Sequence, residues 1–131
     1  MRSMLFVPGD RPERFAKAVA SGADAVILDL EDAVLPERRP HARAEITRWL
    51  ESTERTVPVW VRINPVDTAD ALPDLAAVIA GRPDGIVLPK AREGADVHRV
   101  DHWLEILEAR CGYAAGRIGL PVTRLRRVAR S

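Results

Sequence analysis

Short runs of apolar residues alternate along this chain with longer segments that have the spacing of amphipathic helices. The runs are rich in Val, Ile and Leu and are continuous, which is typical of parallel strands buried on both faces. They occupy residues 4–7, 25–29, 59–63, 85–89 and, more weakly, 117–120. Because single helical segments separate the runs, right-handed crossovers are expected between the strands, and the pattern predicts an α/β fold with a parallel sheet.

The four helical segments place apolar residues three and four positions apart. They cover residues 12–20, 37–50, 71–80 and 95–110. Each segment should lay one apolar stripe against the sheet. In the third segment the predicted stripe consists of Leu72, Leu75, Val78 and Ile79.

Polar or loop-forming residues follow the first four runs, at the point where each predicted strand ends. Ligands of parallel α/β sheets and barrels bind at this carboxyl edge. Asp29, Glu31 and Asp32 follow the second strand, where clustered carboxylates can hold Mg²⁺ through water or act as acid and base. In the alternative interpretation, Asp32 only caps the next turn and the other two acids are solvated. We expect Asp29 to be the most buried of the three.

Two basic residues lie at the ends of the next two runs: Arg62 is next to last in the run 59–63, and Lys90 directly follows the run 85–89. We expect the Arg62 guanidinium to emerge at the same edge, because a buried unpaired charge is costly. Its planar fork of donors suits a substrate carboxylate or a carbonyl oxygen that gains negative charge. A structural ion pair with Asp29 or Glu31 is the alternative, and the two roles are compatible. Lys90 could contact an anionic group or pair with the acids.

Two other arrangements have a functional and a plainer interpretation. Arg11 and Arg14 flank a proline at a predicted helix start, where they could help to hold a phosphate, or they lie in solvent. His98 and His102 have the spacing at which helices bind zinc. Charged neighbours favour a solvated helix face for this pair instead.

Composition narrows the class of protein. With 131 residues, 47% hydrophobic and 30% charged, the chain fits one globular domain and excludes disorder and collagen. No apolar run approaches the roughly 18 residues of a membrane span, and none resembles a secretion signal. Cys111 is the single cysteine, so no intrachain disulfide framework exists. These features predict a cytoplasmic location without a membrane partner.

The net charge of +1 hides an uneven distribution. Four arginines without any acid lie in the last eleven residues, so the body of the chain is mildly acidic. An acidic body argues against a nucleic-acid partner.

Four motifs carry a family resemblance. Residues 2–15, 25–34, 61–65 and 85–90 resemble, in order and spacing, the successive strand motifs of the citrate lyase beta subunit family. That family is grouped with the malyl-CoA lyases in the HpcH/HpaI aldolase superfamily. The resemblance covers residues 2–120, so we interpret residues 1–120 as the N-terminal half of the family's barrel domain and residues 121–131 as a divergent Arg-rich tail.

The resemblance implies a TIM (β/α)8 barrel that assembles into homo-oligomers and uses Mg²⁺. Its reaction makes or breaks a carbon–carbon bond between an acyl-CoA and a small oxo acid. By motif, Arg62 would bind the carboxylate and carbonyl of the oxo acid. Asp29, Glu31 and Asp32 would line the metal and substrate pocket, and the loop that carries Arg14 would lie near the substrate or CoA.

The sequence also departs from the family pattern. The family's direct Mg²⁺ ligands are a Glu in an Ile-Glu-Thr-Ala motif after the fifth strand and an Asp after the next strand. At the first of these positions this chain has Pro121-Val122-Thr123-Arg124. We therefore expect no direct metal ligand in this chain, and a truncated half-barrel of about five strands and four helices. A shifted reading frame after Leu120 is our hypothesis for the tail.

Two other functions compete with a lyase. A response-regulator receiver has about this length and an acidic residue at a strand end, as Asp29 would be here. However, the first strand of this chain ends in Val-Pro-Gly rather than an acidic pair, and Pro89 precedes Lys90 where a receiver has the reverse order. The other alternative is a catalytically silent partner of an intact lyase.

Overall fold

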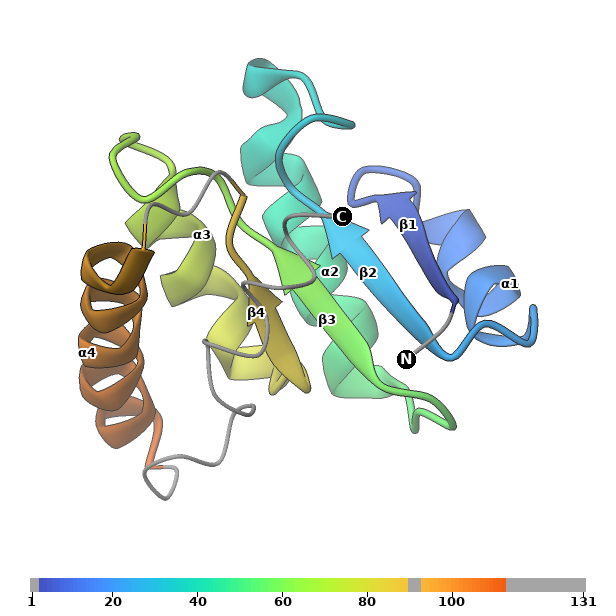
Figure 1. Ribbon diagram of the computed structural model, residues 1–131. Helices are drawn as coiled ribbons and strands as arrows, with labels where there is room; N and C mark the ends of the chain where they lie inside the picture. The colour runs from blue at the N-terminus through green and yellow to red at the C-terminus, as the bar shows by residue number, and fades with distance from the viewer. Residues whose placement is uncertain (1–2, 90–92, 113–131) are drawn as a thin grey trace.

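The computed structural model describes residues 3–89 and 93–112 and contains one parallel sheet (Figure 1). Its strands are β1 (Met4–Pro8), β2 (Ala25–Asp29), β3 (Val59–Arg62) and β4 (Gly85–Val87). They lie in the order β1-β2-β3-β4, and every neighbouring pair is parallel. The α/β prediction is confirmed for these four strands, and the expected strand at 117–120 lies outside the described residues.

The strand order separates the competing folds. In the described sheet each strand pairs with the next strand in sequence, as in a (β/α)8 barrel. A receiver has the order 2-1-3-4-5, with a switch point and helices on both faces. In Figure 1 the described helices lie behind and beside the sheet, and none crosses its front face. The receiver alternative is therefore wrong.

Each predicted helical segment contains a helix, and three of them include a 3₁₀ turn. The α-helices are α1 (Phe15–Val19), α2 (Arg39–Ser52), α3 (Ala71–Val78) and α4 (Glu93–Cys111). Short 3₁₀ helices η1 (Pro12–Arg14) and η2 (Pro36–Arg38) precede α1 and α2, and η3 (Ile79–Gly81) follows α3. Proline is the first residue of both η1 and η2, where its fixed φ and missing N–H are tolerated.

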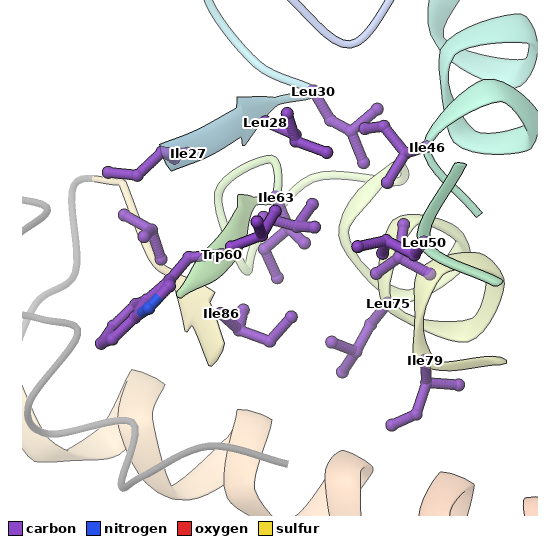
Figure 2. Close-up of a cluster of buried hydrophobic side chains, with 14 of the residues drawn as sticks. Ile27, Leu28, Leu30, Ile46, Leu50, Trp60, Ile63, Leu75, Ile79 and Ile86 are labelled. Carbon is purple, nitrogen blue, oxygen red and sulfur yellow. The ribbon is translucent and has the colours of Figure 1, made fainter. Parts of the chain in front are cut away.

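Side chains of the sheet point alternately toward and away from the helices. Figure 2 shows Leu28 and Ile86 pointing toward α2 and α3, whereas Ile27 and Trp60 point to the opposite face. Asp29 lies two residues after Ile27, and Arg62 lies two residues after Trp60. The two charged side chains therefore lie on the face turned away from the helices, which is the inner face of a barrel.

The predicted stripe of α3 is wrong at one position. Leu72 is 44% exposed, whereas Ala71, Asp74, Leu75 and Val78 are buried. The helix is rotated because Asp74 points inward, where it accepts hydrogen bonds from Asn64 and Arg43. These hydrogen bonds turn the side chain of Leu72 into solvent.

Gly9 lets the loop after β1 pass closely over the end of β2. Its N–H donates to the Asp29 carbonyl at 2.8 Å. A Cβ at this position would lie 2.7 Å from that same oxygen and 2.8 Å from Ile46 Cδ1. The close approach therefore requires a residue without a side chain.

Replacing Gly9 by alanine is expected to lower the free energy of unfolding by about 1–3 kcal/mol, because the backbone carbonyl cannot yield without disturbing the sheet. Urea denaturation followed by circular dichroism measures the change. Gly94→Ala in α4 is the matched control, since its new Cβ would have its nearest neighbour at 3.6 Å. Equal stability of the Gly9 variant and the wild type would contradict the steric argument.

None of the helices in the described ranges is long and apolar enough to cross a bilayer. The three tryptophans belong to the core region: Trp60 is buried, and Trp49 and Trp103 are partly buried against the core. His98 and His102 are both exposed on α4, so the solvated interpretation of that pair is confirmed.

Candidate functional site

An ion pair between neighbouring strands forms the centre of the candidate site. Asp29 and Arg62 are register partners at the ends of β2 and β3. Arg62 Nε donates to Asp29 Oδ1 at 2.7 Å, and Nη2 donates to Oδ2 at 2.8 Å. The Asp29 side chain is 1% exposed and the Arg62 side chain 18%. The ion-pair interpretation of Arg62 is thus realised, in the bidentate geometry that planar guanidinium groups favour.

The backbone of the next loop completes the surroundings of Asp29. The N–H of Glu31 donates to Oδ1 and the N–H of Ala33 donates to Oδ2, both at 2.9 Å. Each carboxylate oxygen therefore accepts two hydrogen bonds. Asp29 orients the guanidinium and also fixes the start of the loop between β2 and α2.

A second carboxylate lies beside the pair. Glu31 is buried, and its Oε1 is 3.7 Å from Arg62 Nε. The hydrogen bonds to Asp29 raise the pKa of Arg62 above its ordinary value, and the charges of Asp29, Glu31 and Asp32 add to this rise. The guanidinium therefore stays charged across the physiological pH range.

Arg62 keeps part of its donor set available. Of its five N–H groups, one on Nε and one on Nη2 are used by Asp29. Among the described residues, no protein group accepts a hydrogen bond from Nη1. Nη1 is also not one of the buried nitrogen atoms that lack a hydrogen-bond partner. The side chain crosses β2 and places its Cζ 4.7 Å from the centroid of the Phe6 ring on β1. The outer end of the fork is thus free to receive a second carboxylate.

The other predicted site residues are placed less centrally. Asp32 is exposed and, together with Glu31, lines a cavity of about 390 Å³ between the loops that follow β2 and β3. Arg14 is exposed and lines a groove of about 410 Å³ along the edge of β1, with Phe6 among the other lining residues. Lys90 lies outside the described residues. The structure therefore brings Asp29, Glu31 and Arg62 together.

The described carboxylates do not fit a direct magnesium site. In residues 3–89 and 93–112, no three His, Cys, Asp or Glu side chains converge as metal ligands. Asp29 has four N–H donors on its two oxygens, which leaves no lone pair directed at a cation. Glu31 faces Arg62 and Asp32 is exposed. Asp29 therefore orients the arginine rather than binding a metal ion.

A buried polar network connects the loops after β2 and β3 with α2 and α3, and it was not predicted. Asn64 follows β3 and donates from Nδ2 to the Leu30 carbonyl at 3.0 Å and to Asp74 Oδ2 at 2.7 Å. Asp74 also accepts from the Asn64 N–H and from Arg43 Nε. Burial raises the pKa of Asp74 above its ordinary value, and these donors oppose the rise. The network holds the loops after β2 and β3 at a fixed separation.

Curated relatives share a large part of this chain. A model of the HpcH/HpaI aldolase/citrate lyase family matches residues 2–123. The citrate lyase subunit beta-like protein of Mycobacterium tuberculosis is 50% identical over 93 residues, which are 71% of this chain and 33% of that protein. The citrate lyase subunit beta of Haemophilus influenzae is 34% identical over 88% of this chain and 40% of its own length. A (3S)-malyl-CoA thioesterase of Cereibacter sphaeroides is 38% identical over 76% of this chain and 35% of its own length.

Solved structures agree with these relatives. The citrate lyase beta subunit of M. tuberculosis, complexed with oxaloacetate and magnesium, has a TM-score of 0.65 and 45% identity over 74% of this chain and 42% of that chain. RipC from Yersinia pestis has a TM-score of 0.62 and 30% identity over 82% of this chain and 43% of that chain. The four-stranded sheet therefore matches part of the TIM barrel of these relatives. The chain spans between a third and two fifths of the length of the three curated relatives described above.

Proposed function

The chain belongs to the HpcH/HpaI aldolase/citrate lyase family, and from this membership and the geometry of Arg62 we propose that it supplies the oxo-acid site of a carbon–carbon lyase. The substrates would be acyl-CoA esters of the citryl-CoA or malyl-CoA type. Their cleavage leaves an enolate on the thioester and releases an oxo acid. A site for this reaction must hold the carboxylate of the oxo acid and stabilise developing negative charge.

The open end of the Arg62 fork is the observation that carries this proposal. Asp29 occupies Nε and one side of Nη2, so the remaining N–H groups of Nη1 and Nη2 can bind a second carboxylate end-on. The ion pair fixes the plane of the guanidinium before a ligand arrives, which reduces the entropy lost on binding. Asp29 is then a positioning residue, and Arg62 is the group that touches the substrate.

The charge balance favours a second cation at this site. Asp29 and Glu31 both lie beside Arg62, so the positive charge of the arginine is already offset before an anionic ligand enters. A dicarboxylate would therefore gain little net Coulomb energy from Arg62 alone. Solved relatives from M. tuberculosis are complexed with magnesium and either oxaloacetate or acetoacetate and coenzyme A. We propose Mg²⁺ as the cofactor, held by groups other than the described carboxylates.

Isothermal titration calorimetry with oxaloacetate tests the site. We expect saturable binding that becomes tighter when Mg²⁺ is added, because the cation supplies the missing positive charge. Diethyl oxaloacetate is the matched control ligand, since it keeps the carbon skeleton and lacks both carboxylates. Absence of oxaloacetate binding with and without Mg²⁺ would contradict the proposed function.

A second reaction of the same substrates follows from one relative. The similarity to a (3S)-malyl-CoA thioesterase favours thioester hydrolysis as the alternative outcome. The products distinguish the two reactions: a lyase releases acetyl-CoA and an oxo acid, whereas a thioesterase releases free CoA and the hydroxy acid. Several expectations stay predictions. They are the roles of Asp32, Arg14 and Lys90, the homo-oligomeric assembly, the silent-partner alternative and the cytoplasmic location.

A further inference from the structure

Phe6 is an aromatic residue of β1 that lies on the same face of the sheet as the ion pair. We propose that Phe6 is a positioning residue that holds the Arg62 guanidinium flat across β2, so that its free N–H groups face a bound carboxylate. The inference rests on the proposed oxo-acid role of Arg62. It adds a residue from a third strand to the site.

The path of the arginine side chain carries the first step of the argument. Arg62 lies on β3 and Phe6 on β1, with β2 between them. Neighbouring strands are about 4.8 Å apart, so an arginine that contacts both must lie along the sheet rather than stand away from it. The Arg62 Cζ is 4.7 Å from the Phe6 ring centroid, over the ring, which is within the range of a cation–π contact.

Asp29 and Phe6 restrain different motions of the guanidinium. Arg62 donates both hydrogen bonds to Asp29, and bidentate pairs of this kind lie close to the guanidinium plane. They fix the direction of the fork but allow the group to rock about the axis that joins the two partners. The Phe6 ring, whose centroid lies 4.7 Å from the Arg62 Cζ, opposes that rocking. With both contacts present, the outer edge of the guanidinium remains available to a ligand.

Leu5 provides a matched comparison for Phe6. The Phe6 side chain lies on the face opposite the helices, and the residue is 41% exposed. Leu5, the preceding residue on β1, is 39% exposed. The two residues therefore form a natural pair for comparison: they have similar exposure on one strand and point to opposite faces.

Nuclear magnetic resonance of the arginine side chains tests the contact without any ligand. In the wild-type chain, the Arg62 Nε–H proton should be shifted upfield by the ring current, and its order parameter should be high. Arg62→Lys removes this resonance and so assigns it. In Phe6→Leu we expect the upfield shift to disappear and the order parameter to fall, while Phe6→Tyr retains both. Leu5→Ala is the control and should leave the resonance unchanged.

Ligand affinity provides the second measurement. Phe6→Leu should weaken oxaloacetate binding by about two- to fivefold, the effect of one partly exposed cation–π contact, and Phe6→Tyr should restore wild-type affinity. If Phe6→Leu does not fold, Phe6→Met takes its place in both measurements. An Arg62 resonance with the same shift and order parameter in the aliphatic variant would overturn the inference. A changed resonance in a chain that never binds oxaloacetate would instead overturn the proposed function and leave the positioning role standing.

Discussion

Replacing Asp29 by asparagine is expected to lower the free energy of unfolding by about 3–5 kcal/mol, the range for removing one partner of a buried ion pair. The substitution keeps the size of the side chain, but one oxygen becomes an NH₂ group. Each Asp29 oxygen accepts two N–H donors. Either orientation of the amide therefore places donors against donors, and rotation of the amide cannot relieve the conflict.

Chemical denaturation of the full chain measures this effect, and thermal unfolding should show a midpoint lower by about 10 °C or more. Asp32→Asn is the matched control. It changes an exposed acid in the same loop and should alter stability by no more than about 0.5 kcal/mol. If Asp29→Asn lowers the free energy of unfolding no more than Asp32→Asn does, the ion pair contributes little to the stability of the fold.

Replacing Arg62 by alanine is expected to weaken oxaloacetate binding by about 2–5 kcal/mol, or about 30-fold and more, as for removal of a hydrogen-bonded charge from an interface. The oxaloacetate affinity of Arg62→Lys should lie between the affinities of Arg62→Ala and the wild type. Lysine keeps the charge but loses the two-pronged contact. Calorimetry with oxaloacetate and Mg²⁺ provides the measurement.

The Arg62 variants also lose one partner of the buried ion pair and should be less stable, although Asp29 keeps the N–H donors of Glu31 and Ala33. Circular dichroism before the titration establishes that they are folded. Arg48→Ala controls for the loss of one positive charge, since Arg48 lies on α2 with a side chain that is 69% exposed. Unchanged affinity in Arg62→Ala would reject this arginine as the carboxylate anchor. Equal losses in the Arg48 and Arg62 variants would assign the effect to net charge alone.

The strands and the ion pair could be predicted because both follow from local patterns. Continuous apolar runs identify buried parallel strands. Asp29 and Arg62 each close a run, and in a parallel sheet with sequential order the ends of neighbouring strands are adjacent. Once the strand order is known, the sequence therefore predicts that these two side chains lie next to each other.

The contact with Phe6 could not be predicted in the same way. It runs diagonally across an intervening strand and depends on the direction that a long flexible side chain takes. No spacing in the sequence specifies that direction. In the sequence, Phe6 is one of several apolar residues in a predicted strand. This pattern gives no indication that Phe6 contacts a charged group.

The inward position of Asp74 was missed for a different reason. Charged residues are almost never fully buried unless they are paired, so an acid in a helical segment reads as solvent-exposed. A signal was nevertheless present. Arg39 and Arg43 are four residues apart on α2, and so are Asp70 and Asp74 around the start of α3. Arg39 and Arg43 both form ion pairs with Asp70, and Arg43 also pairs with Asp74. Matching spacings of opposite charges in two helical segments can therefore indicate that ion pairs link the two helices.

In the part of the chain that the structure describes, the side chains that contact Arg62 come from β1, β2 and the loop after β2. Phe6, Asp29 and Glu31 all precede it in the sequence, and each of these strands pairs with the next one along the chain. The hydrogen bonds between Asp29 and Arg62 join residues 33 positions apart, so they are non-local contacts that form when β2 and β3 pair. During synthesis, the proposed oxo-acid anchor can therefore assemble once β3 has emerged, because all three of these contacting residues precede Arg62 in the chain.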